Sequence, residues 1–300
     1  MKWIVSAFAD EAADSLIEQI EALQEAGIFH LEIRGVDGQN IGKITPQQAK
    51  EIRKRLDDGG IAVSSIGSPF GKIKVTEHFA PHFDEFQAGL EVAHILGAKT
   101  IRMFSFFTDG RPHPECKDTV LERLEKFLTA AKGSGVLLCH ENEKGIYGDT
   151  AAHCLELHEV FGHRLGGVFD PANYLQCGDS TLEAHRLVKP YITYYHVKDV
   201  SLDTGAIVPA GEGDGQIVEL LRQLREQPGE TFVTLEPHLQ AFSGLAQLEH
   251  DGGASIKHKY RFANNRESFA FAAVALKKSL AEAGYTEKNG LWEYNPTIRE

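Results

Sequence analysis

The chain has 300 residues, and 42% of them are hydrophobic, which is enough to bury a large core. Its formal net charge of −12 argues against a nucleic-acid partner, because such a partner favours a basic binding face. No apolar run approaches the roughly 20 residues of a membrane span, and the beginning of the chain has no signal-peptide layout. The four cysteines lack CxxC spacing, so we expect reduced thiols in a cytoplasmic protein.

Strand-like and helix-like segments alternate along the chain. The expected strands cover residues 3–8, 30–33, 61–66, 99–104, 136–139, 167–169, 192–195 and 231–235. A helical pattern follows each strand; the helix after residue 45 has Thr45 as N-cap and Pro46 at its first position. Alternation of this kind, with buried strands, predicts a parallel sheet. A doubly wound open sheet would usually carry a glycine-rich turn after the first strand, and residues 9–13 form no such turn. The pattern therefore predicts an α/β fold, a (β/α)8 TIM barrel.

We expect residues 1–300 to form a single barrel domain, because no linker-like composition or charge run divides the chain. Two long insertions, at about 201–215 and 239–265, follow the last two strands, and a short C-terminal tail follows residue 284. Loops of that length are usually functional. The second insertion contains glycines and the basic residues Lys257, Lys259 and Arg261. We expect it to be a mobile flap that closes on an anionic or polar substrate; a static oligomer contact is the alternative.

Four successive strands end in a side chain that can bind a metal. Glu141, Asp170, His196 and Glu236 each follow a short apolar run without an intervening turn. In a (β/α)8 barrel the carboxyl ends of the strands carry the chemistry, so these side chains should meet at one face. Three carboxylates and one imidazole suit a divalent ion, and two of the carboxylates can also exchange protons with a substrate. The alternative is that each residue merely caps the next helix.

Other polar residues near the strand ends are candidates for binding substrate. Lys198 should point the same way as His196, by strand alternation. Arg102 lies inside an apolar strand and must find a carboxylate, so a buried ion pair with Glu32 is the alternative to a substrate contact. The remaining histidines, such as His78, His82, His153 and His158, are expected to be solvated. The full set of candidate substrate-binding residues is Arg34, Lys72, Arg102, Asn142, Asn173 and Lys198.

Five segments carry a resemblance to a known family: His140-Glu141-Asn142, residues 169–173, His196-Val197-Lys198-Asp199, residues 211–215 and Leu235-Glu236-Pro237. With them the chain resembles the sugar phosphate isomerase/epimerase branch of the xylose-isomerase-like barrel superfamily. The resemblance implies one divalent metal ion held by the four strand-end residues, Mn²⁺ first, with Mg²⁺, Co²⁺ or Zn²⁺ as alternatives. It also implies that Glu141 and Glu236 are the acid/base pair.

The expected function is therefore metal-dependent isomerisation or epimerisation of a small sugar, keto-sugar or sugar phosphate, by proton transfer through a metal-bound enediolate. A sugar-type dehydratase, of the inosose or dehydroshikimate kind, is the alternative. An abasic-site DNA endonuclease is disfavoured, because its strand-six histidine is replaced here by Asn173 and the chain is acidic. A non-enzymatic sugar-binding protein would leave two proton-exchanging carboxylates unexplained. The expected partner is a small polyhydroxylated or keto-sugar substrate, with no nucleic acid, no membrane and a possible homo-oligomer.

Overall fold

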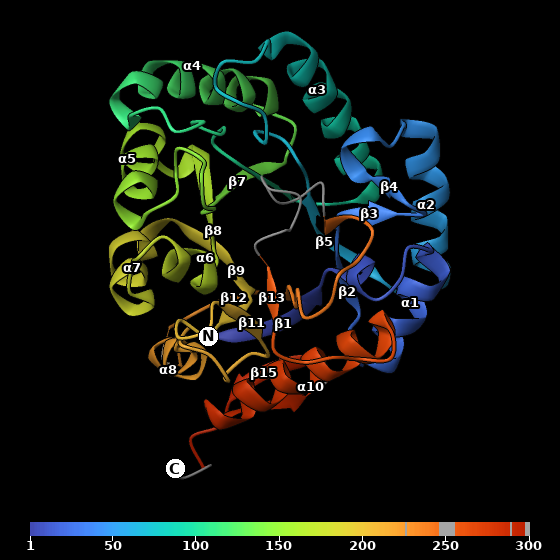
Figure 1. Ribbon diagram of the computed structural model, residues 1–300. Helices are drawn as coiled ribbons and strands as arrows, with labels where there is room; N and C mark the ends of the chain where they lie inside the picture. The colour runs from blue at the N-terminus through green and yellow to red at the C-terminus, as the bar shows by residue number, and fades with distance from the viewer. Residues whose placement is uncertain (226, 246–255, 289, 298–300) are drawn as a thin grey trace.

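The computed structural model describes residues 1–225, 227–245, 256–288 and 290–297. Eight parallel strands form its centre, and the first and last of them pair in register from Lys2↔Glu230 to Ala7↔Leu235, which closes the barrel (Figure 1). The predicted (β/α)8 fold is confirmed. These strands are β1 (Lys2–Ala7), β2 (His30–Ile33), β5 (Ala62–Gly67), β6 (Thr100–Met103), β7 (Leu137–Glu141), β8 (Leu165–Phe169), β9 (Ile192–Val197) and β12 (Glu230–Leu235).

Helices surround the barrel and cover its outer face (Figure 1). They are α1 (Leu16–Glu25), α2 (Pro46–Asp58), α3 (Phe79–Leu96), α4 (His113–Ala131), α5 (Ala151–Phe161), α6 (Pro171–Gln176), α7 (Thr181–Val188), α8 (Ile217–Gln223) and α10 (Asn265–Glu282). The predicted start of α2 is correct: Thr45 is the N-cap, Pro46 is the first helical residue, and Thr45 and Gln48 form a reciprocal capping box. The helices α3 and α4 begin at Phe79 and His113.

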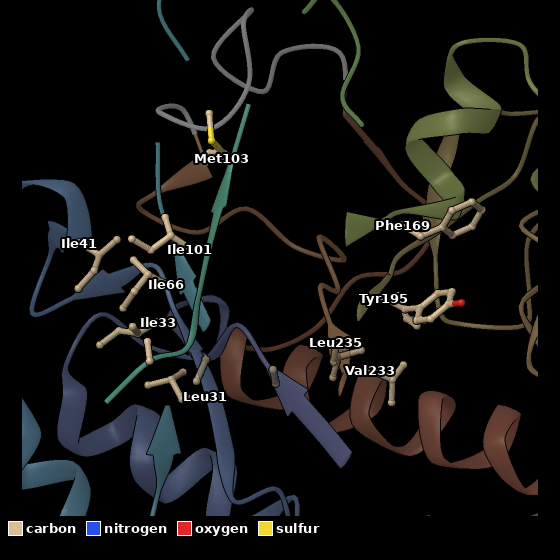
Figure 2. Close-up of a cluster of buried hydrophobic side chains, with 14 of the residues drawn as sticks. Leu31, Ile33, Ile41, Ile66, Ile101, Met103, Phe169, Tyr195, Val233 and Leu235 are labelled. Carbon is tan, nitrogen blue, oxygen red and sulfur yellow. The ribbon is translucent and has the colours of Figure 1, made fainter. Parts of the chain in front are cut away.

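The main hydrophobic core lies between the strands and the helices, and Figure 2 shows part of it. Leu31 and Ile33 of β2 both belong to this core, whereas Glu32 between them makes its hydrogen bonds with Tyr194 and His196 of β9. Side chains of a strand alternate between its two faces, so the apolar set faces the helices and the polar set faces the barrel interior. The same alternation places Phe169 and Tyr195 in the core.

The two long insertions contact each other at the mouth of the barrel. β10 (Asp199–Val200) and β11 (Ala206–Val208) pair antiparallel, and β11 pairs parallel with β13 (Lys257–His258) of the second insertion. Another short hairpin, β3 (Gly35–Val36) with β4 (Gln39–Asn40), follows β2. Gly252 and Gly253 of the expected flap lie outside the described residues, so the flap stays a prediction.

Residues 285–288 and 291–294 form a hairpin where the sequence suggested only a tail. β14 (Tyr285–Lys288) pairs with β15 (Leu291–Tyr294), and β15 pairs antiparallel with the first half of β1, from Lys2↔Glu293 to Ile4↔Leu291. The hairpin therefore extends the sheet beside β1, and Trp292 is buried there.

Two histidines that the sequence suggested were solvated are buried. His82 on α3 is 8% exposed and accepts a hydrogen bond at Nε2 from the backbone N–H of Gly71, 2.7 Å away. His158 on α5 is 2% exposed and stacks on Tyr191. The prediction was wrong because each lies on the inner face of its helix. In the described part of the chain, no helix combines the length and the apolar character needed to cross a membrane.

Candidate metal centre

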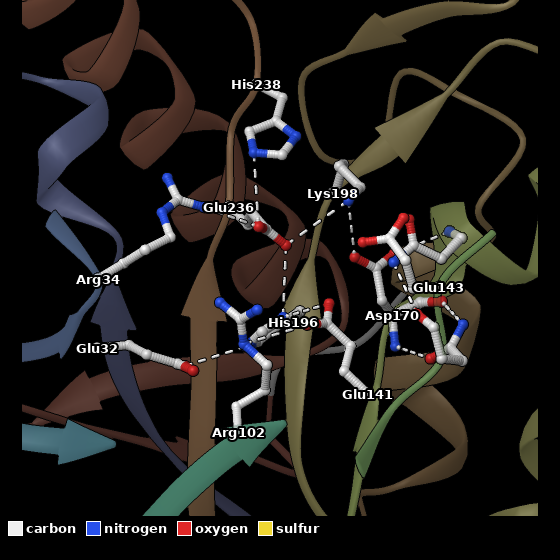
Figure 3. A network of polar contacts seen from close by, with 12 residues as sticks. Glu32, Arg34, Arg102, Glu141, Glu143, Asp170, His196, Lys198, Glu236 and His238 are labelled. Atoms are coloured by element: carbon white, nitrogen blue, oxygen red, sulfur yellow. Dashed lines mark hydrogen bonds and ion pairs between the residues drawn. The ribbon is translucent and has the colours of Figure 1, made fainter. Parts of the chain in front are cut away.

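The four predicted ligands come together at the carboxyl ends of β7, β8, β9 and β12. Glu141 is the last residue of β7, His196 lies in β9, and Asp170 and Glu236 directly follow β8 and β12. Each offers one ligand atom, and these atoms all lie within 4.8 Å of one another (Figure 3). All four side chains are buried. A buried cluster of carboxylates and an imidazole of this kind could hold a metal ion.

His196 sits between carboxylates on both sides of its ring. Its Nε2 lies 3.0 Å from Oε2 of Glu32, and its Nδ1 lies 2.9 Å from Oε1 of Glu141 and 3.4 Å from Oε2 of Glu236. Burial by itself lowers the pKa of His196, but Glu32 and Glu141 together raise it well above its usual range. Glu32 in turn accepts a hydrogen bond from the hydroxyl of Tyr194, at 2.8 Å. The ring is thus oriented so that Nδ1 faces the other ligands.

Asp170 serves as N-cap of α6. Its Oδ1 accepts the backbone N–H of Asn173 at 3.0 Å, while Oδ2 has no hydrogen-bond partner among the described residues. Nζ of Lys198 lies 3.2 Å from Oδ2. Burial raises the pKa of Asp170 to about 7, against the opposing effect of Lys198. Oδ2 is therefore a buried acceptor that a cation can satisfy.

Asn142 and Asn173 hold the strand ends together. The amide of Asn142 accepts from the backbone N–H of Asp170 and donates to its carbonyl, both at 3.0 Å. Asn173 donates from Nδ2 to the carbonyl of Asn142 at 2.8 Å. Asn142 thus positions Asp170. The expected substrate contacts of both asparagines stay predictions.

Glu236 is the most heavily contacted ligand. Its Oε1 lies 3.0 Å from Nη1 of Arg34, and its Oε2 lies 3.6 Å from Nζ of Lys198. Burial by itself raises the pKa of Glu236, but Lys198 and the imidazoles beside it lower the pKa well below its usual range. The carboxylate is therefore ionised at neutral pH.

Asp10 and Glu11, which sequence reasoning did not assign to the site, belong to it. Arg34 donates to both oxygens of Asp10, at 2.9 and 3.0 Å, and to Oε1 of Glu11 at 3.1 Å. Burial raises the pKa of Glu11 to about 8, although Arg34 opposes this. His238 lies close by, with Nε2 3.4 Å from Oε1 of Glu11. The available signal was position, since Asp10 and Glu11 lie three and four residues after the end of β1, near the carboxyl end of that strand.

The other two predicted basic residues also contact carboxylates. Nε of Arg102 lies 3.3 Å from Oε2 of Glu141, so the ion pair expected with Glu32 is instead made with a candidate ligand. Nζ of Lys72 lies 3.0 Å from Oε2 of Glu143, and both side chains are nearly buried. Whether any of these residues binds substrate stays a prediction.

The chemistry of the cluster fits a divalent metal ion. Oδ2 of Asp170 and Oε2 of Glu236 lack hydrogen-bond partners in the described part of the chain, and Nδ1 of His196 lies 3.4 Å from Oε2 of Glu236. Oxygen and imidazole donors together suit Mn²⁺, Co²⁺ or Zn²⁺. Glu11, Glu236 and His238 form a second group with suitable spacing, but Arg34 already donates to both of its carboxylates.

Taken together, these features define a (β/α)8 barrel with a buried carboxylate–histidine cluster at its carboxyl-end mouth. The model of the family described as xylose isomerase-like TIM barrel matches residues 20–258. The chain belongs to this family, which confirms the resemblance stated from the sequence. No curated protein matches the chain.

Solved structures with the same fold include several enzymes. D-psicose 3-epimerase in the presence of D-fructose has a TM-score of 0.72 and 18% identity, with 94% of this chain and 99% of that chain covered. The IolI protein with a bound zinc atom has a TM-score of 0.71 and 15% identity, with 93% and 99% covered. A xylose isomerase-like TIM barrel/4-hydroxyphenylpyruvate dioxygenase fusion protein has a TM-score of 0.71 and 16% identity. The match covers 95% of this chain and 44% of that longer chain. At these identities the likeness shows the fold.

Proposed function

We propose that this protein is a divalent-metal-dependent isomerase or epimerase of a small sugar or keto-sugar. The observation that carries the proposal is the pair Glu141 and Glu236. Glu141 is the last residue of β7, Glu236 directly follows β12, and both belong to one buried ligand cluster. The likeness to D-psicose 3-epimerase and to zinc-bound IolI supports it. Glu141, Asp170, His196 and Glu236 would hold the metal, which supplies charge that stabilises the oxyanion developing on the substrate carbonyl.

The two glutamates perform the proton transfers. A proton next to a carbonyl is weakly acidic, so its removal needs a base held close to that carbon. One glutamate removes this proton, and the other returns a proton to the opposite face or to the neighbouring carbon. Arg102 lies against Glu141 and Arg34 against Glu236, so each carboxylate is fixed by its own guanidinium. Fixed carboxylates on two sides of one site allow a planar intermediate to be protonated from either face.

The orientation of the remaining residues supports this chemistry. His196 is held by Glu32, so that its Nδ1 faces Glu141 and Glu236. Asp170 is held by Asn142 and by its role as helix cap. Because these contacts already exist in the folded chain, binding of substrate does not have to arrange them, which is the condition for efficient proton transfer.

The test is solvent exchange during turnover. Metal-loaded protein is incubated in D2O with a panel of ketoses and aldoses, and the carbon next to the carbonyl is followed by NMR. We expect deuterium at that carbon together with an epimer or isomer. Glu141→Gln and Glu236→Gln, assayed at saturating metal, should each lower turnover by at least ~10²-fold. Epimer formed without deuterium would contradict the mechanism, and loss of water from the sugar would assign the dehydratase alternative.

A further inference from the structure

We infer that the substrate of this site is an uncharged polyhydroxy carbonyl compound, and that the site discriminates against sugar phosphates and sugar acids. The inference rests on the proposed function and specifies its substrate class. It comes from the charges around the ligand cluster, where the predicted substrate-binding residues Arg34, Lys72, Arg102 and Lys198 already contact carboxylates of the protein. Figure 3 shows Arg34, Arg102 and Lys198 beside these carboxylates.

Both arginines are buried and lie against carboxylates. Arg34 is 2% exposed and donates to Asp10, Glu11 and Glu236 over 2.9 to 3.1 Å. Its guanidinium also lies 4.2 Å from the ring centroid of Phe8. Arg102 is 2% exposed as well, with Nε 3.3 Å from Glu141. Arg34 cannot turn to an anionic substrate without leaving the buried carboxylates of Asp10 and Glu11, which are not proposed metal ligands, uncompensated.

The two lysines are engaged in the same way. Nζ of Lys198, which is 5% exposed, lies 3.2 Å from Asp170 and 3.6 Å from Glu236. Nζ of Lys72 lies 3.0 Å from Glu143 and 4.3 Å from the ring centroid of Phe104. A bound metal would take over part of the charge of Asp170 and Glu236, whereas the contact between Lys72 and Glu143 involves no proposed ligand.

Carboxylates outnumber cations around the cluster. The buried acidic side chains are Asp10, Glu11, Glu32, Glu141, Glu143, Asp170 and Glu236, and the buried basic ones beside them are Arg34, Arg102 and Lys198, with Lys72 at the edge. Two positive charges from a metal ion would not give this set an excess of positive charge. The segment 246–255, outside the described residues, contains no lysine or arginine in its sequence.

Two basic residues of the second insertion contact the first insertion instead of the ligand cluster. Lys257 donates to the carbonyl of Thr204, and Lys259 lies 3.3 Å from Glu212, both on the first insertion. These contacts connect the two insertions. The basic cluster that suggested closure on an anionic substrate is therefore engaged with the first insertion, apart from Arg261, which is exposed.

Uncharged hydroxyl and carbonyl groups suit the atoms that remain open. Nη2 of Arg102 and Nε2 of His238 have no hydrogen-bond partner among the described residues, although both side chains are buried. A hydroxyl or carbonyl oxygen can accept from either atom while the neighbouring ion pairs stay intact. A phosphate or carboxylate in the same place would add negative charge beside Glu141 and Glu236, at an electrostatic cost that the ion pairs do not offset.

The experiment compares matched pairs on the metal-loaded full chain: D-ribulose with D-ribulose 5-phosphate, D-xylulose with its 5-phosphate, and D-fructose with D-fructose 6-phosphate. Solvent deuterium exchange gives kcat/KM for each member. We expect the uncharged member of a reactive pair to be favoured by at least ~10²-fold. Faster exchange in a phosphorylated member overturns the inference and leaves the proposed function standing. Exchange in no member of any pair counts against the proposed function itself and removes the basis of the inference.

Two variants then test the physical cause. Glu143→Gln and Asp10→Asn each remove one carboxylate from the mouth and keep its shape, so each should reduce the preference for the uncharged sugar by about tenfold. Glu159→Gln removes a carboxylate from the exposed face of α5 and is the matched control, for which we expect an unchanged ratio. If both mouth variants fold, as judged by circular dichroism, and keep the ratio of the wild type, the charge argument is overturned.

Discussion

Glu32 should control metal affinity although it does not belong to the proposed ligand set. It is fully buried, and its Oε2 lies 3.0 Å from Nε2 of His196. A carboxylate that accepts the second ring N–H of a metal-binding histidine fixes the tautomer and makes the ligand more basic. Glu32→Gln keeps an acceptor but removes the charge. We expect the metal dissociation constant to rise about 10- to 100-fold, which corresponds to about 1.4 to 2.7 kcal/mol.

The assay is competition with a chromophoric chelator for Mn²⁺ and Zn²⁺. Glu32 also raises the pKa of His196, so it stabilises the protonated imidazole, whose proton competes with the metal for the ring nitrogen. The comparison is therefore made over about pH 7 to 9, and the loss of affinity should be largest at the high end. Tyr194→Phe removes one hydrogen bond to Glu32 and keeps its charge, so its effect should be smaller. A folded Glu32→Gln protein with the affinity of the wild type would refute the reasoning.

The remaining predictions concern stability. His82 and His185 are buried with pKa values lowered to about 4 from 6.5, chiefly by burial, so the unfolded state binds more protons between these values. The free energy of unfolding should therefore fall as pH drops from about 6.5 to about 4. In urea titrations the His82→Gln protein should show a smaller fall than the wild type. An equal fall in the two proteins would contradict the contribution of His82. Gly71→Ala should cost about 3 kcal/mol or more in denaturant titrations, because a Cβ would lie 2.0 Å from the carbonyl oxygen of Phe104 at φ +87°. Gly110→Ala, at φ +76° in open space, is the control and should cost only about 1 to 2 kcal/mol; equal losses in the two variants would contradict the steric argument.

The sequence was sufficient for the barrel and for the grouping of the strand-end residues. Each of β7, β8, β9 and β12 has its predicted ligand within its last two residues or directly after its end, and closure of the sheet brings successive ends to one mouth. Glu141, Asp170, His196 and Glu236 could be found together for this reason. Their binding of a metal ion remains a prediction.

The ion-pair partners of charged side chains inside the barrel could not be predicted in the same way. Arg102 was expected to pair with Glu32 if it did not bind substrate, yet it lies against Glu141, while Glu32 contacts His196. Local alternation gives the face on which a side chain lies, but not which of several opposite charges it reaches. Asp10 and Glu11 lie shortly after β1, but acidic residues in that position also favour the dipole of a following helix, so position alone did not assign them to the site.

The most direct test of the account is metal stoichiometry. Protein stripped with chelator and reloaded with Mn²⁺, Co²⁺ or Zn²⁺ is measured by elemental analysis after removal of free metal. We expect one ion per chain in the wild type, and loss of stoichiometric binding in Asp170→Ala, which removes a buried ligand whose Oδ2 has no hydrogen-bond partner among the described residues. No bound metal, or three ions per chain, would contradict the central claim.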